Sequence, residues 1–229
     1  MPIKRSYAVQ GDACATAHAM ELLGDRWTYP VLRELMLAPK RFAELEASLR
    51  GVTPAVLTAR LRQLEAAGLV RRTALPAPAR VTVYAVTQWA AELRPVFESL
   101  GRWALRSPVR DVDGCGLTPD AIAQSMLTMA PPLTMDPPLY VELRLADMRV
   151  NRDAERYIYR LHWADRLSIE RDRAPDAAVT ISGDSTTWAG VLYDGIDLSS
   201  MEVGGERAAA QRLVAAFAGV LEDAGAVAR

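Results

Sequence analysis

The stretch TPAVLTARLRQLEAAGLVRR, residues 53–72, is the part of the sequence that best suits a binding site. Thr53 and Pro54 favour a helix start, because a threonine hydroxyl can accept a hydrogen bond from a free amide and proline has no amide to leave unpaired. The outward face of this helix is expected to be small or basic, with Ala55, Thr58, Ala59 and Arg62. Such a face can approach the major groove of DNA, where methyl groups contact thymine and a guanidinium reaches a guanine edge or a phosphate.

Other basic residues flank this helix along the chain. Lys40 and Arg41 precede a predicted helix and could bind a phosphate together with its first amides. Arg72 begins a predicted hairpin, and Arg80 lies near its tip, from where an arginine can enter the minor groove. The sequence therefore predicts a DNA-binding site that comprises Lys40, Arg41, Thr53, Pro54, Ala55, Thr58, Arg62, Arg72 and Arg80.

Short helices and one hairpin are expected to position this site. Apolar residues recur at helical spacing in the quoted helix, with Leu57, Leu61 and Leu64 inward, and in four further segments, residues 14–23, 28–37, 42–49 and 89–105. Two strand-like segments, residues 69–73 and 80–87, flank the proline-rich sequence ALPAPA. Two helices joined by a tight turn and followed by a hairpin predict a mainly α winged helix-turn-helix domain.

The second half of the chain predicts an α+β domain. Thr118 and Pro119 repeat the pattern of a helix start, for a helix that ends near Met129. Four strand-like segments follow, residues 139–146, 156–163, 166–171 and 177–184, and then two helices, residues 185–195 and 205–221. This order predicts a four-stranded antiparallel sheet packed on helices, with Ser185 as a helix cap and Gly204-Gly205 as a turn.

Charge divides the chain at the same place. The net charge of the 229 residues is −1, but residues 1–110 contain 16 Lys and Arg against 9 Asp and Glu, a net charge of +7. Residues 111–229 contain 11 basic and 19 acidic residues, a net charge of −8. The basic half suits a polyanion such as DNA, which would repel the acidic half. We therefore expect a DNA-binding domain in residues 1–107, a linker in 108–116 and a second domain, with a different kind of partner, in 117–229.

Several classes of protein do not fit the sequence. No apolar run approaches the roughly 20 residues of a membrane helix, and no signal peptide is visible, so a cytoplasmic protein without a membrane partner is expected. The chain has two cysteines and two histidines, and they form no metal-binding pattern. Nucleotide-binding and nucleophile motifs are also missing, so the sequence predicts no cofactor, no metal and no enzymatic activity.

The first half resembles the HxlR-type winged helix-turn-helix regulators. The resemblance covers about residues 12–105 and rests on CATAHAMELLGDRWTYPVLREL, KRFAELEASLRGVTPAVLTARLRQLEAAGLVRR and YAVT. It implies a homodimeric transcription factor whose dimer contact uses the first and last helices of the domain. It also implies that Thr53, Pro54, Ala55, Thr58 and Arg62 face DNA and that Arg80 is the wing residue. Pro30, Trp89 and the apolar wing tip depart from the family pattern.

Two residues of this half have alternative interpretations. Arg60 could contact a phosphate, or it could form an internal salt bridge with Glu44 or Glu65. Cys14 resembles the cysteine that some members of this family use as a thiol sensor. A lone cysteine on a helix is more often a small apolar residue.

The second half resembles sterol-carrier-protein-like domains over about residues 117–222. The sequences APDAAVTISGDSTTW and VGGERAAAQRL support most of this resemblance, which implies an apolar tunnel for a lipid-like molecule. Methionine and aromatic side chains suit an adaptable binding wall, but the same residues also suit a filled core. The predicted ligand-binding residues are Met126, Met129, Tyr157, Tyr159, Trp163 and Trp188.

These observations favour one function and leave two alternatives. The leading hypothesis is a sequence-specific, homodimeric regulator that binds a pseudo-palindromic operator in double-stranded DNA and responds to a small apolar effector. The first alternative is a carrier of a lipid-like ligand, or a partner-docking protein, in which DNA binding is secondary. The second is a redox-sensing regulator that acts through the Cys14 thiol.

Overall fold

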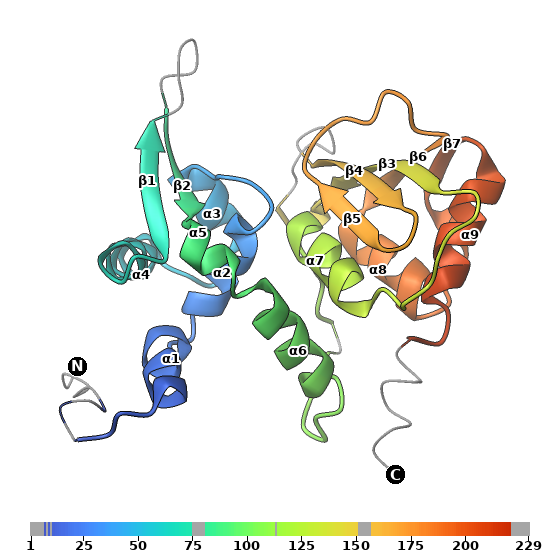
Figure 1. Ribbon diagram of the computed structural model, residues 1–229. Coiled ribbons are helices and arrows are strands. Elements are labelled where there is room, and N and C mark those ends of the chain that lie inside the picture. Colours follow the sequence, from blue (N-terminus) through green and yellow to red (C-terminus); the bar gives the residue numbers. More distant parts are fainter. Residues whose placement is uncertain are drawn as a thin grey trace. The chain divides into compact units, whose positions relative to one another are not determined.

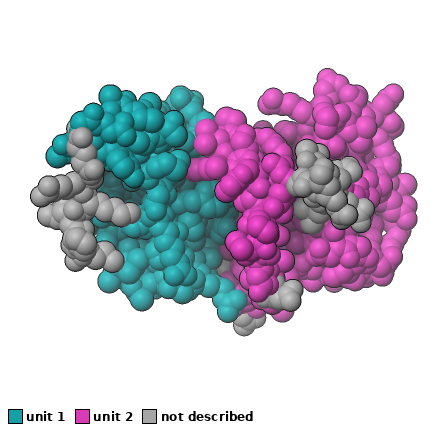
Figure 2. All heavy atoms as spheres, turned by 90° about the horizontal axis from the view of Figure 1, so that it is seen from below, with its two compact units in different colours: residues 1–93 teal, residues 94–229 magenta. Residues whose placement is uncertain are grey.

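The computed structural model describes Tyr7, Val9 and residues 11–74, 81–112, 114–150 and 157–220 (Figure 1). The chain forms two compact units, residues 1–93 and residues 94–229 (Figure 2). The boundary between the units precedes the linker that the sequence predicts at 108–116. Each unit has its own apolar core.

The first unit contains the predicted winged helix-turn-helix order. Its described elements are α1 (Ala15–Leu23), α2 (Thr28–Leu35), α3 (Phe42–Ser48), α4 (Pro54–Ala66), β1 (Val70–Ala74), β2 (Thr82–Val86) and α5 (Gln88–Ala91). The three leucines of α4 that the periodicity places inward, Leu57, Leu61 and Leu64, are at most 1% exposed. Their burial holds the opposite side of α4 toward solvent.

The start of α4 follows the expected chemistry. The Thr53 hydroxyl accepts a hydrogen bond from the Val56 amide at 3.3 Å, and Pro54 occupies the first turn. Gly51, in the turn before α4, and Gly68, in the turn after it, both have positive φ angles, of +85° and +72°. Glycine adopts this conformation without steric cost, so both turns can be tight.

The wing is an antiparallel hairpin with one additional backbone partner. β1 pairs with β2 in a register that places Val70 opposite Val86 and Arg72 opposite Tyr84. The Lys40 amide donates to the Tyr84 carbonyl at 3.0 Å, and the Tyr84 amide donates to the Lys40 carbonyl at 2.8 Å. The segment before α3 is therefore hydrogen-bonded to the wing.

The helix predicted over residues 89–105 is divided in two. α5 ends at Ala91, and α6 (Arg94–Ala104) begins three residues later in the second unit. Pro95 accounts for the break, because proline has no amide to donate to the carbonyl four residues earlier, that of Ala91, and its ring crowds that carbonyl. The Arg102 guanidinium donates to the Thr128 carbonyl at 2.8 Å and thereby connects α6 to the following helix.

The second unit contains one sheet with helices. Its other described elements are α7 (Pro119–Met129), β3 (Leu139–Ala146), η2 (Met148–Val150), β4 (Ile158–Trp163), β5 (Leu167–Glu170), β6 (Val179–Asp184), α8 (Ser185–Tyr193), η4 (Leu198–Ser200), β7 (Glu202–Gly205) and α9 (Arg207–Phe217). Val141, Leu143 and Leu145 of β3 are fully buried and alternate with Glu142 and Arg144, a pattern that would place these two polar residues on the solvent face. The cap of α8 is Asp184 and not Ser185, because the Asp184 carboxylate accepts the amides of Thr186 and Thr187.

The sheet differs from the predicted four antiparallel strands. It has five described strands in the order β5-β4-β3-β6-β7, and β3 pairs with β6 in parallel. Alternating side chains predict a strand but not the direction of its neighbour, and the chain between β5 and β6 returns across the sheet. Asp172 of this connection forms an ion pair with Arg160 at 3.3 Å, and the Ala174 amide donates to Glu142 at 2.6 Å. Glu142, which the pattern places in solvent, is consequently only 3% exposed.

The fifth strand, β7, includes Gly204 and Gly205, for which the sequence predicts a turn. Gly205 lies opposite Val179 of β6, and Gly204 lies opposite Thr180. A short segment with two glycines shows no alternation, so the periodicity could not indicate this strand.

Candidate nucleic-acid interface

The solvent-facing side of α4 contains the central predicted DNA contacts. Thr53, Pro54, Ala55 and Arg62 are exposed, and Thr58 is half-buried beside them. Alanine side chains at positions 55 and 59 leave the helix backbone accessible. The structure thus brings these five predicted residues together along one side of α4 and its N-cap.

Arg62 and Arg60 have different environments although they are two residues apart. Among the described residues, the Arg62 side chain has no hydrogen bond or ion pair, and it is exposed. Arg60 forms an ion pair with Asp25, and its side chain is 16% exposed. The internal salt bridge is therefore the correct interpretation of Arg60, although its partner is Asp25 and neither Glu44 nor Glu65. Arg62 is the cation of α4 that remains available to a ligand.

The predicted phosphate contact by Lys40 is wrong. Its ammonium lies 2.5 Å from a carboxylate oxygen of Glu34, and the two side chains are 2% and 0% exposed. A solvent-accessible phosphate cannot reach a cation that is enclosed and paired in this way. The backbone hydrogen bonds between Lys40 and Tyr84 of β2 fix Lys40 beside the wing.

Arg41 remains a candidate contact, but the helix after it offers less than predicted. The Glu44 carboxylate accepts the Arg41 amide at 2.8 Å, so an internal anion already occupies the N-terminus of α3. The Arg41 residue itself is exposed. Its contribution to DNA binding would come from the guanidinium alone.

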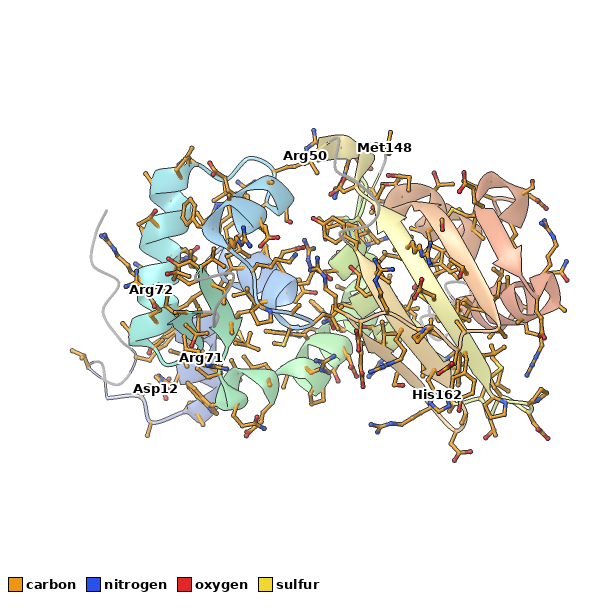
Figure 3. All side chains as sticks on the ribbon, turned by 90° about the horizontal axis from the view of Figure 1, so that it is seen from above. Asp12, Arg50, Arg71, Arg72, Met148 and His162 are labelled. Carbon is orange, nitrogen blue, oxygen red and sulfur yellow. The ribbon has the colours of Figure 1, made fainter. Side chains whose placement is uncertain are left out.

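The wing contributes two exposed arginines. Arg71 and Arg72 project from β1 (Figure 3), and the Arg71 guanidinium lies 3.4 Å from the Thr73 hydroxyl. Neighbouring residues of a strand point to opposite faces, so only one of the two can face a given DNA backbone. Arg80, the predicted wing residue, lies outside the described residues.

Two exposed polar residues near α4 were missed by the sequence reasoning. Arg50 lies in the turn before Gly51 (Figure 3), and Gln63 follows Arg62 on the solvent side of the helix. Glutamine can bind an adenine edge through two hydrogen bonds, as arginine can bind guanine. The helical spacing that predicts an exposed Arg62 also predicts an exposed Gln63, so the sequence does contain a signal for Gln63.

The predicted ligand-binding residues of the second unit form its core. All six are at most 7% exposed: Met126, Met129, Tyr157, Tyr159, Trp163 and Trp188. The Trp188 indole lies 3.4 Å from the Met126 sulfur, the Tyr159 hydroxyl donates to Asp120 at 2.7 Å, and the Trp163 ring packs edge-on against Phe217. None of the six lines either of two surface grooves of this unit. The filled-core interpretation is therefore correct for these residues, since their neighbours are other side chains.

The Cys14 thiol is exposed at the start of α1. Hydrogen bonds from the Ala17 and Thr16 amides lower the pKa of this thiol. A lower pKa increases the fraction of thiolate, which is the reactive form. The expectation that a lone cysteine is a buried apolar residue is wrong here.

The described part of the chain has neither a candidate metal site nor a candidate membrane-spanning helix. It contains no group of three or more His, Cys, Asp or Glu side chains that could hold a metal ion. Within the same residues, no helix is long and apolar enough to cross a bilayer.

The helices α1 to α4, the exposed outer face of α4 and the β1–β2 hairpin define the first unit as a winged helix-turn-helix. The HxlR-like helix-turn-helix family model matches residues 22–110, and the chain belongs to this family.

The relatives are transcriptional regulators, not enzymes. The HTH-type regulator sll1512 of Synechocystis is 39% identical over 87 residues, which are 38% of this chain and 64% of that protein. YvaP and YodB of Bacillus subtilis are 33% and 34% identical and are covered over 80% and 77% of their lengths, again by 38% of this chain. The reduced form of YodB is a similar solved structure, with a TM-score of 0.40, 30% identity and coverage of 43% of this chain and 97% of that one.

Proposed function

We propose that this protein is a homodimeric transcriptional regulator in the cytoplasm that binds a pseudo-palindromic operator in double-stranded DNA. In each copy, α4 enters the major groove, with Thr53, Pro54, Ala55, Thr58 and Arg62 toward the bases. Arg41, Arg72 and Arg80 contact the phosphates or the minor groove. The observation that carries this proposal is the outer face of α4, where small side chains surround an arginine that has no partner among the described residues.

The domain roles follow the charge division. Residues 1–107 bind DNA and form the dimer, residues 108–116 connect the halves, and residues 117–229 bind a small apolar effector. The mixed sheet and its helices agree with the layered α+β architecture that a sterol-carrier-like domain requires. An effector regulates DNA binding only through unequal affinity for two arrangements of the dimer.

Dimerisation through the first and last helices of the domain has physical support. Neither α1 nor α6 contains a buried residue. Val96, Leu100 and Trp103 of α6 follow helical spacing and are 44%, 45% and 67% exposed. An apolar stripe of this kind is costly to leave in water, and a second copy of the chain would cover it.

The experiment that tests DNA binding compares two arginine variants. Arg62→Ala should weaken binding to the DNA upstream of the protein's own gene by about 1–3 kcal/mol, because one base or phosphate contact is lost. Arg166→Ala removes another exposed arginine, from the second unit, and should leave the affinity unchanged. Equal affinities of both variants and the wild type would contradict the role of α4.

Thiol sensing through Cys14 is a second candidate function, favoured by the exposure and lowered pKa of that thiol. Two similar solved structures, both with TM-scores below 0.5, are described as diamide-treated YodB and as the oxidised form of the redox regulator HypR. Under this function, Cys14→Ser should abolish an effect of diamide on DNA binding. An unchanged response in Cys14→Ser would exclude Cys14 as the sensor.

A further inference from the structure

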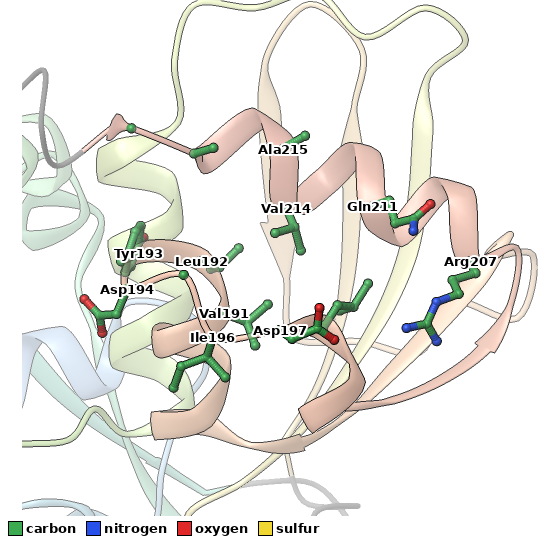
Figure 4. A pocket seen from close by; sticks show the side chains of 14 residues that line it. Val191, Leu192, Tyr193, Asp194, Ile196, Asp197, Arg207, Gln211, Val214 and Ala215 are labelled. Carbon is green, nitrogen blue, oxygen red and sulfur yellow. The ribbon is translucent and has the colours of Figure 1, made fainter.

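A surface groove between α8 and α9 has no part in the proposed DNA contact. Its volume is about 670 Å³, and Figure 4 shows the side chains that line it. One wall is the end of α8 with the loop of residues 194–197, and the other wall is the outer side of α9. The volume lies within the roughly 300–1,000 Å³ of small-molecule sites.

The middle of the groove is apolar. Val191 of α8 is 3% exposed, whereas Ile196 of the loop is 45% exposed, and Val214 of α9 faces both. Gly190 permits this arrangement, because a Cβ atom at that position would lie 2.5 Å from the Ile196 Cδ1 atom. An isoleucine that is held over a helix and still faces solvent offers an apolar contact to a ligand.

One end of the groove is electrically negative. Asp194, which follows α8 directly, is exposed, and its carboxylate has no hydrogen bond or ion pair with any described residue. Ala218 and Gly219, which follow α9, line the same groove. The last carbonyls of a helix carry a partial negative charge, and neither α8 nor α9 has a basic residue in its last turn. A carboxylate and the negatively polarised C-terminal ends of two helices therefore lie at this end of the groove.

The cation that lines the groove is at its other end. Figure 4 shows Arg207 and Asp194 at opposite ends, with Asp197 between them. The Asp197 carboxylate accepts the Ser199 amide at 2.7 Å, and hydrogen bonds from Ser199 lower the pKa of Asp197. Arg207 thus interacts with Asp197, and no described cation lines the Asp194 end of the groove.

We infer that this groove binds a small amphiphilic cation. The apolar body of the ligand would lie against Val191, Ile196 and Val214, and its ammonium or phosphonium group would lie beside Asp194. The net charge of −8 over residues 111–229 attracts such a ligand to this half of the chain. The inference rests on the proposed function in one respect, namely that this ligand is the effector, whose apolar body then also bears a cationic group.

Two ions of the same shape and opposite charge test the inference. Tetraphenylphosphonium and tetraphenylborate each present four phenyl rings, so a difference in their binding to the full-length chain reports charge. Isothermal titration without DNA should show saturable, one-to-one binding of tetraphenylphosphonium and at least about tenfold weaker binding of tetraphenylborate. Equal affinities for the two ions would overturn the inference.

Matched variants locate the binding to this groove. At low salt, Asp194→Asn should weaken tetraphenylphosphonium binding about fivefold, as the loss of an exposed ion pair does. Asp176→Asn removes an exposed carboxylate from the β5–β6 connection and should have no effect. Val214→Arg should weaken binding about tenfold more than Val214→Gln, because both fill space but only one adds positive charge. Equal effects of Asp194→Asn and Asp176→Asn would overturn the site, and this pair decides even if the Val214 variants do not fold.

The effector role is measured separately. Tetraphenylphosphonium should change the affinity of the wild-type protein for its operator and should not do so for Asp194→Asn. If the cation binds in the groove without changing that affinity, its role as effector is overturned and the site stands. If the chain does not bind DNA at all, the proposed function fails, and the titrations without DNA still decide the groove.

Discussion

The Lys40 ammonium and the Glu34 carboxylate form a buried ion pair with 2.5 Å between nitrogen and oxygen. Glu34 also accepts the Arg33 guanidinium at 3.0 Å, so one buried anion interacts with two cations. The pair connects α2 to the segment before α3. Its position explains why a lysine beside an exposed arginine has a structural role and not a DNA contact.

Lys40→Met should destabilise the first unit strongly. Removal of one partner of a buried ion pair leaves an uncompensated charge and typically costs about 3–5 kcal/mol. Arg33 lessens this cost because it remains near Glu34. Urea unfolding should therefore show a loss of about 3 kcal/mol in the free energy of unfolding. Lys40→Met with wild-type stability, together with a lower salt dependence of DNA binding, would return Lys40 to the DNA interface.

If a second copy covers α6 as proposed, Leu100→Asp should convert the dimer to a monomer. The substitution places a charge in the apolar stripe of α6, where a second copy would bury it without a partner. Leu133→Asp is the matched control, because Leu133 is 42% exposed in a loop and Leu100 is 45% exposed. Sedimentation equilibrium should give the monomer mass for Leu100→Asp and the dimer mass for Leu133→Asp. A dimer in both cases would place the contact elsewhere.

Gly205→Ala should destabilise the second unit, whereas Gly204→Ala should have little effect. Gly205 has a φ angle of +89°, and an added Cβ atom would lie 2.5 Å from the Ala178 carbonyl oxygen. Strain of this kind costs about 1–3 kcal/mol. A Cβ atom at Gly204 would meet nothing within 4 Å. Thermal unfolding of the two variants measures the difference, and similar midpoints would show that β7 is not paired as described.

The Cys14 thiol should react with iodoacetamide faster than the Cys115 thiol in the same molecule. Both cysteines are exposed, so access does not distinguish them, but amide hydrogen bonds lower the pKa of Cys14. Because a lowered pKa preserves thiolate as the pH falls, the ratio of the two rates should increase from pH 8.5 to pH 7. Peptide mass spectrometry of a timed reaction measures both rates. A ratio near one at both pH 8.5 and pH 7 would show that Cys14 is no more reactive than Cys115.

The helices and the buried faces of the strands could be predicted because each rests on local periodicity. Leu57, Leu61 and Leu64 follow the spacing of a helix, and Val141, Leu143 and Leu145 follow that of a strand. The helix starts at Thr53 and Thr118 could also be predicted, since each threonine caps the amides that come three residues later.

The features that were mispredicted depend on contacts between distant residues. The parallel pairing of β3 with β6 is set by a connection that passes over the sheet and covers Glu142. Lys40 is buried because Glu34 and Tyr84 lie beside it, which its own neighbours in sequence do not indicate. For the second unit, methionines and aromatic residues at regular spacing suit a core and a ligand wall equally, so spacing alone could not separate the two.

Selection of bound duplexes from a random-sequence pool tests the central claim, that α4 reads DNA, most directly. The full-length wild-type protein should enrich an inverted repeat whose half-sites are separated by about one helical turn, roughly 10–11 base pairs between centres. Arg62→Ala should enrich the same repeat but lose preference at one base position in each half-site. No enriched repeat, or an identical base preference in the wild type and Arg62→Ala, would show that Arg62 of α4 does not read the operator.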